Sequence, residues 1–106
     1  MQLIVHLIRL HPDTDPAAFE SWVRDVDYAT CPALPSVRAF SVQRAPNPPD
    51  APWHYFEIIM VTSREDFEQD MSTPDFKSLV TAFDTMAEVV DEFAGTRVEP
   101  GYVAHS

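Results

Sequence analysis

Two strongly apolar segments of the chain each contain acid–base side chains. His6 lies within the run QLIVHLIRL, and Glu57 lies within the run WHYFEIIMVT. A carboxylate in the middle of an apolar strand needs a partner, because an unpaired buried charge is costly. Glu57 therefore has two interpretations. It forms a structural ion pair with an arginine such as Arg38, either within the chain or across a dimer, or it is a general base with a raised pKa.

Three further polar side chains join Glu57 as candidate catalytic residues. His6 is either functional or a hydrogen-bonded core histidine. His54 and Tyr55 come just before Glu57 and are candidate proton donors, with packed aromatic side chains as the alternative. The candidate catalytic set is therefore Glu57, His6, His54 and Tyr55.

Aromatic and guanidinium side chains are the candidate ligand-binding residues. Trp22 is an expected core residue that could also wall a ligand cavity, together with Phe40 and Phe56. We expect Arg38 to orient the ligand. Arg9 is included as well, although strand alternation places it on the other face of the strand from His6. At that strand end we expect Arg9 to be exposed to solvent or held in an ion pair.

Standard catalytic and cofactor motifs are absent from this sequence. There is no P-loop, no G-x-G-x-x-G, no H-E-x-x-H and no G-x-S-x-G, and the chain has only 2 glycines. The single cysteine, Cys31, excludes a multi-cysteine metal site, and the scattered histidines give no metal-ligand spacing. We therefore expect no metal and no cofactor, and we expect an unreactive Cys31.

Length and charge limit the partners. The 106 residues predict a single domain over 1–106, and the formal net charge of −10 disfavours nucleic acid and anionic membrane surfaces. No apolar run is long enough to span a membrane, and the first residues are typical of a strand, not of a signal peptide. These features predict a cytoplasmic protein.

The pattern of apolar residues predicts six elements in the order β-α-β-β-α-β. Strands are expected over 2–10, 36–44, 53–62 and 96–104, and helices over 16–29 and from Pro74 to about residue 93, with an additional short helix over 64–72. Gly95 is the expected residue just beyond the long helix. This order is typical of an α+β, ferredoxin-like fold, a four-stranded antiparallel sheet with helices on one face.

The other face of that sheet needs a cover. The first and third predicted strands carry apolar residues on both alternating sets of positions. A domain this small hides a second apolar face most easily against another copy of itself, which predicts a homodimer built as a dimeric α/β barrel. By the same assignment, the acidic residues belong to the helices and the strands are mildly basic, so arginines near the sheet could attract an anionic or electron-rich ligand.

Several short stretches resemble the dimeric α/β-barrel superfamily, over roughly residues 2–98. They are the opening strand at 3–7, Phe19, the turn at 35–37, Phe56-Glu57 with the following 63–67, and Thr73-Pro74 with Phe76. Asp70 and Asp75 stand where family members typically have histidines, a departure from the monooxygenase and haem-degrading members.

Within that superfamily the chain is most similar to the RedY-like (HapK-type) proteins of prodigiosin-type pigment pathways. This resemblance implies an accessory role in tripyrrole pigment assembly, in which a bipyrrole aldehyde condenses with a pyrrole. The residues themselves favour a cofactor-free enzyme or assembly factor that acts on a small aromatic or heteroaromatic metabolite. The alternatives are a non-catalytic metabolite-binding dimer, a cofactor-free monooxygenase of the antibiotic-biosynthesis type, and a structural dimer without a cavity.

Overall fold

The chain forms a four-stranded sheet whose central strands are its most apolar segments. In the computed structural model, which describes residues 1–105, β1 (Gln2–Leu10) pairs with β3 (Tyr55–Val61) and with β4 (Ala87–Thr96). β2 (Val37–Arg44) pairs with β3, so the order is β2-β3-β1-β4 and every neighbouring pair is antiparallel. This arrangement is the ferredoxin-like α+β fold, and it confirms the fold class that the sequence predicts.

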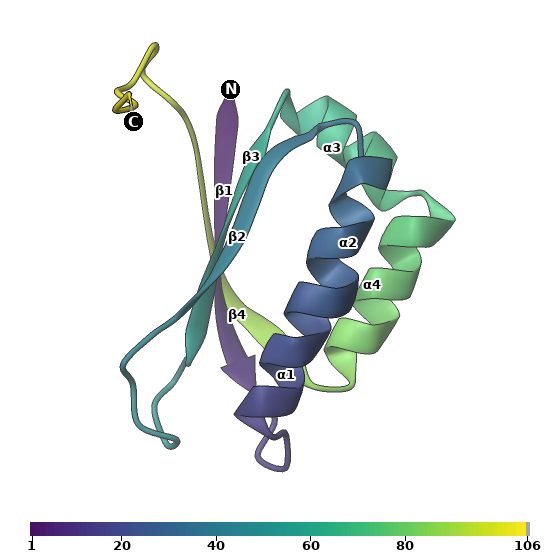
Figure 1. Ribbon diagram of the computed structural model, residues 1–106, viewed down its shortest axis with the longest axis vertical. Coiled ribbons are helices and arrows are strands. Elements are labelled where there is room, and N and C mark those ends of the chain that lie inside the picture. The colour runs from purple at the N-terminus through teal and green to yellow at the C-terminus, as the bar shows by residue number, and fades with distance from the viewer. Residues whose placement is uncertain (106) are drawn as a thin grey trace.

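All helices cover one face of the sheet, and the other face is bare (Figure 1). The first connection is a continuous helical segment made of α1 (Pro16–Trp22), a π turn (Val23–Asp27), α2 (Tyr28–Thr30) and a 3-10 turn (Cys31–Ala33). The second connection contains α3 (Arg64–Met71) and α4 (Pro74–Asp84).

Side-chain caps mark the start of α1, α3 and α4. The Asp15 side chain accepts a hydrogen bond from Ala17 N just ahead of Pro16. At α3, Ser63 Oγ accepts a hydrogen bond from Asp66 N. At α4, Thr73 Oγ1 accepts one from Phe76 N. These acceptors satisfy backbone N–H groups that have no partner within the helix.

The π turn changes which side chains of the first helical segment face the sheet. Its wider hydrogen bond runs from Tyr28 N to Val23 O, five residues apart. Regular α-helical spacing from Phe19 would place Val26 on the inner face, but Val26 is 42% exposed. Asp27 faces the space between helix and sheet instead.

The predicted long helix after Pro74 was wrong in its second half. α4 ends at Asp84, with Thr85 as its C-cap, and residues 87–96 form β4. The apolar spacing of residues 86–93 fits a helix as well as a strand. Pairing decides the outcome, because the edge of β1 that β3 does not use has backbone groups that need partners. No strand forms over 97–105, and Gly95 lies within β4.

This correction also moves acidic residues onto the sheet. β4 contains Glu88, Asp91 and Glu92. The four strands together hold three arginines and four carboxylates, so the expectation of a mildly basic sheet was wrong.

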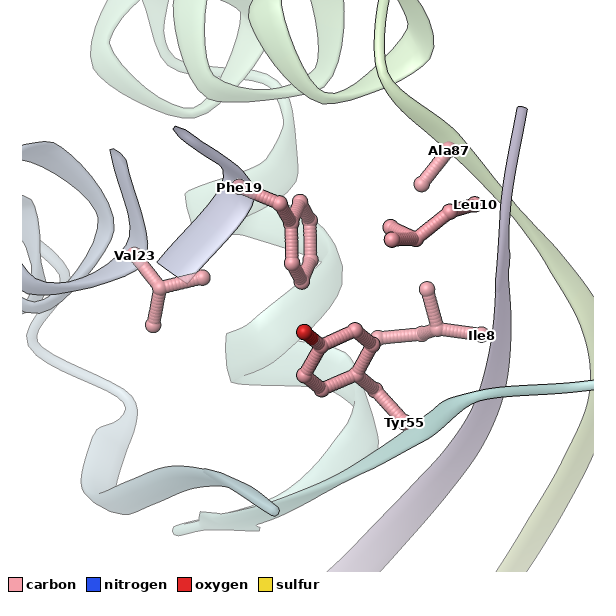
Figure 2. Packing of buried hydrophobic residues seen from close by; sticks show 6 residues of the cluster. All are labelled: Ile8, Leu10, Phe19, Val23, Tyr55 and Ala87. Atoms are coloured by element: carbon pink, nitrogen blue, oxygen red, sulfur yellow. The ribbon is translucent and has the colours of Figure 1, made fainter. Parts of the chain in front are cut away.

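The core at one end of the domain is centred on Phe19. Its ring centroid lies 4.9 Å from that of Tyr55 and 6.2 Å from that of Phe83. Figure 2 shows Phe19 reaching from α1 toward Tyr55, Ile8 and Leu10 on the sheet. A second cluster, of Ile4, Ile59, Val61 and Phe67, fills the other end. The space between the two clusters contains the candidate site.

The outer edge of β2 is irregular. The pairing of β2 with β3 shifts register between Val37 and Ala39, so the exposed Arg38 lies in a bulge. Further along, Val42 N donates a hydrogen bond of 3.0 Å to the Tyr28 hydroxyl.

Candidate functional site

A cavity of about 340 Å³ lies between the helices and the middle of the sheet. That volume is within the range of small-molecule pockets in proteins. Its walls are mostly apolar and include five aromatic side chains, which are Trp22, Phe40, Phe67, Phe76 and Phe83.

The sheet wall of the cavity carries a histidine held between two carboxylates. His6 on β1 lies opposite Glu57 on β3 and Glu92 on β4 in the strand register. His6 Nδ1 lies 2.7 Å from Glu57 Oε1, and His6 Nε2 lies 2.8 Å from Glu92 Oε1. Protonated imidazole is the form that can donate from both nitrogens at once.

Electrostatics favour that protonated form. Burial opposes the charge on His6, but hydrogen bonds to Glu57 and Glu92 and the charges of both carboxylates outweigh it, so the pKa of His6 is raised above 6.5. Reciprocally, the hydrogen bond from His6 and its charge, with a contribution from Arg64, lower the pKa of Glu92. The three side chains therefore form a charged network across three strands.

Glu57 keeps one oxygen free for a ligand. Its Oε1 is engaged by His6, while no residue within 1–105 forms a hydrogen bond with Oε2. Every fully buried side-chain oxygen or nitrogen of the described residues has a partner, so Oε2 must be open to the cavity. Glu57 is thus presented to a ligand while His6 fixes its orientation.

A second carboxyl group faces the cavity from the helix layer. Asp27, at the end of the π turn, lines the same space as Glu57, and its side chain has no hydrogen-bond partner among residues 1–105. Burial, and then the charge of Glu57, raise the pKa of Asp27 to about 7. A carboxyl in this state can hold or release a proton near neutral pH.

Cys31 lies one turn beyond Asp27 and also lines the cavity. Its thiol donates to Asp27 O at 3.5 Å, and burial together with the charges of Asp27 and Glu57 raises the thiol pKa to about 11. The nucleophilic thiolate form is therefore scarce at neutral pH.

His54 and Tyr55 do not line this cavity. His54 Nδ1 accepts a hydrogen bond from Leu10 N at 3.1 Å, and its Nε2 lies 2.9 Å from Pro49 O, so it joins backbone segments. Tyr55 is 3% exposed in the Phe19 core. Its hydroxyl donates to Glu20 Oε2 at 2.7 Å, and burial and that carboxylate raise the pKa of Tyr55 to about 12.

Two of the expected ligand-binding residues line the cavity, and the other three do not. Trp22 and Phe40 line the cavity. Phe56 projects from the opposite face of the sheet, because adjacent residues of a strand alternate, and it packs against Trp53 instead. Arg38 is exposed in the β2 bulge, and Arg9 forms an ion pair with Glu88.

Two site residues were missed by the sequence analysis. Glu92 was assigned to a helix, and the pairing of β4 with β1 is what brings it to His6. Asp27 was counted as helix surface, and no local signal in the sequence marks the π turn.

Within residues 1–105, no cluster of three or more His, Cys, Asp or Glu side chains is arranged to hold a metal ion. The same residues contain no helix with the length and apolarity needed to cross a membrane.

Comparison with known proteins identifies the family. The family model described as REDY-like protein HapK matches residues 2–98, nearly the whole chain. The chain belongs to the REDY-like HapK family. It is 51% identical to HapK from Hahella chejuensis, whose crystal structure superposes with a TM-score of 0.96 over 99% of this chain and 100% of that one. A search of the curated proteins found no match.

More distant structures share the fold of this HapK-family protein. SnoaB from Streptomyces nogalater, a cofactor-independent oxygenase, is 20% identical, with a TM-score of 0.74 over 93% of this chain and 94% of that one. A dimeric ferredoxin-like protein from Thermobifida fusca is 14% identical, with a TM-score of 0.67 over 89% and 86%. At such identities the likeness shows the fold alone.

Proposed function

We propose that this HapK-family protein is a cofactor-free enzyme that joins two small heteroaromatic metabolites by general acid–base catalysis. The observation that carries the proposal is Glu57, which His6 orients and which presents a free oxygen to an aromatic-walled cavity. We further propose that the reaction is a pyrrole condensation in prodigiosin-type pigment biosynthesis, which is the pathway implied by the resemblance to RedY-like proteins.

The residues of the cavity suit each proton transfer of such a condensation. A carbon–carbon bond forms between a pyrrole ring carbon and an aldehyde carbon, and water is lost. Glu57 Oε2 accepts the proton released from the ring carbon. Asp27, which is protonated in part near neutral pH, protonates the aldehyde oxygen as the bond forms, so that this oxygen becomes a hydroxyl group. Glu57 then returns its proton to the hydroxyl group, which leaves as water, and the ionised Asp27 accepts the pyrrole N–H proton. His6 and Glu92 are positioning residues that hold Glu57 in place.

We also propose that the protein works as a homodimer. The face of the sheet without helices carries apolar side chains that are only partly covered, namely Leu3, Val5, Leu7, Phe56, Ile58 and Met60. Phe93 on β4 is 54% exposed. A second copy packed face to face would remove this surface from water.

A colour-forming condensation tests the catalytic proposal. Pyrrole carbaldehyde and dimethylpyrrole condense to a coloured dipyrrin, so absorbance follows turnover directly. We expect the protein to accelerate this reaction and Glu57→Gln to reduce the acceleration by about 100-fold or more. Glu65→Gln, which removes the same charge from an exposed position on α3, should leave the rate unchanged.

Two other outcomes would favour the alternatives. Binding of the pyrroles without acceleration, unaffected by Glu57→Gln, would indicate a non-catalytic metabolite-binding dimer. Oxygen uptake with a polyphenol would instead indicate a monooxygenase. Either result would overturn the condensation proposal.

A further inference from the structure

The charges that line the cavity are predominantly negative. Five acidic residues are among those that line it, Asp27, Glu57, Asp84, Glu88 and Glu92, and the Glu88 carboxylate is paired with Arg9. The positive groups on its lining are His6 and Arg64. His6 is held between Glu57 and Glu92, and Arg64 forms ion pairs with Glu68 at 3.4 Å and with Glu92 at 3.8 Å. The positive charges of the lining are therefore already engaged by carboxylates.

Two of the carboxyl groups are available to a ligand from opposite layers. Asp27 belongs to the helix layer and Glu57 to the sheet layer, and each has oxygen without a hydrogen-bond partner in the described part of the chain. Because every fully buried polar side-chain atom there is satisfied, these oxygens open to the cavity. A ligand between them would meet acceptors on both sides.

The apolar walls determine the shape and polarity of what can enter. The aromatic rings of Trp22, Phe40 and Phe83 line the cavity, so a flat ring finds stacking partners. Aromatic faces also attract delocalised positive charge, and the attraction grows when water is excluded. A ligand carboxylate would meet like charges and lose its hydration without gaining a free positive partner.

We propose that this cavity selects flat aromatic ligands that carry positive charge, with the free oxygens of Asp27 and Glu57 as their electrostatic partners, and that it excludes aromatic anions. This ligand class rests on the proposed function, and it gives the carboxyl groups a second role. When the hydroxyl group of the pyrrole–aldehyde adduct is protonated and leaves as water, a delocalised aromatic cation remains. A negatively charged cavity stabilises that cation more than its neutral precursors.

The test uses three probes that share a ring system and differ in charge, which are naphthylmethylamine, naphthylmethanol and naphthoate. Their affinities are measured by titration calorimetry at about pH 8, above the pKa of Asp27, so that Asp27 is mostly ionised. We expect the amine to bind about tenfold or more tightly than the alcohol, and the carboxylate to bind more weakly than either.

Variants assign the selectivity to the two carboxyl groups. Asp27→Asn and Glu57→Gln should each reduce the affinity for the amine by about three- to tenfold and leave that for the alcohol within about twofold. Because Glu57→Gln also removes a partner of His6, Asp27→Asn is the independent check. Glu65→Gln is the matched control and should change none of the affinities.

Equal affinities for the three probes, or tighter binding of naphthoate, would overturn the inference. So would unchanged amine affinity in both cavity variants. The outcome is separable from that of the condensation assay. Selective amine binding without condensation would overturn the proposed reaction and leave the ligand class standing, whereas condensation without charge selectivity would do the reverse.

Discussion

The carboxyl group of Asp27 makes the stability of the folded protein depend on pH in an unusual direction. Burial and the charge of Glu57 raise the pKa of Asp27 from 3.8 to about 7. Between those values the folded protein holds a proton that the unfolded chain has released, so the free energy of unfolding falls as pH rises through this range. Asp27→Asn removes the charge with little change in shape and should abolish this loss.

The size of the effect follows from the two pKa values. Each pH unit between 3.8 and about 7 lowers the free energy of unfolding by about 1.4 kcal/mol. The total loss above neutral pH is therefore at most about 4 kcal/mol. The cavity is accessible to water, which eases the cost of the charge. We therefore expect Asp27→Asn to raise the free energy of unfolding by about 1–3 kcal/mol at about pH 8.

Urea unfolding followed by tryptophan fluorescence measures this difference. Wild type and Asp27→Asn are compared at about pH 8 and about pH 4, at one protein concentration because association would shift the midpoint. The advantage of the variant should be largest at the higher pH and nearly absent at the lower one. Asp25→Asn, at an exposed position two residues away, should show no such dependence. An Asp27→Asn advantage of the same size at both pH values would refute the reasoning.

Two further predictions concern carboxylates outside the cavity. Asp70 is 7% exposed and accepts hydrogen bonds from Ser36 N at 2.8 Å and from Ser36 Oγ at 2.5 Å. Asp70→Ala should therefore lower the free energy of urea unfolding by about 2–4 kcal/mol, and a loss below about 0.5 kcal/mol would contradict the assignment. Hydrogen bonds from Arg44 and Tyr55 lower the pKa of Glu20 to about 2, so its carboxylate adds stability above its ordinary pKa of 4.5 that is lost as pH falls toward 2. Glu20→Gln should lower the free energy of unfolding at neutral pH by less than about 1 kcal/mol, because the ion pair of Glu20 with Arg44 lies near water. The variant should also lose less stability than wild type on acidification, as measured by melting temperature. Equal acid sensitivity in both proteins would contradict this.

Local signals in the sequence accounted for most of the fold. The side-chain caps at Asp15, Ser63 and Thr73 each join residues two or three positions apart in the sequence. The end of α4 was missed because residues 86–93 satisfy both helical and strand spacing. Only the pairing with β1 decides between them, and pairing partners are distant in the sequence.

The candidate site was predicted in part for a related reason. Glu57 and His6 stand out as polar residues within apolar strands, and strand register brings them together. The expected partner of Glu57 was an arginine such as Arg38, but within this chain Glu57 pairs with His6, and Arg38 is exposed in the β2 bulge. Asp27 reaches the cavity through a π turn, and this small change in helix geometry depends on packing more than on a sequence signal.

The irregular edge of β2 bears on how copies of this chain can meet. An open strand edge is a template for strand addition and, if it repeats from molecule to molecule, for fibre growth. Here the backbone N–H of Val42 already donates a hydrogen bond to the Tyr28 hydroxyl. On the same strand, the bulge at Arg38 distorts the edge and adds a positive charge to it. Neighbouring molecules would have to break that hydrogen bond to extend the sheet through this edge. This edge therefore resists open-ended polymerisation, while the bare face of the sheet stays available for a closed pair.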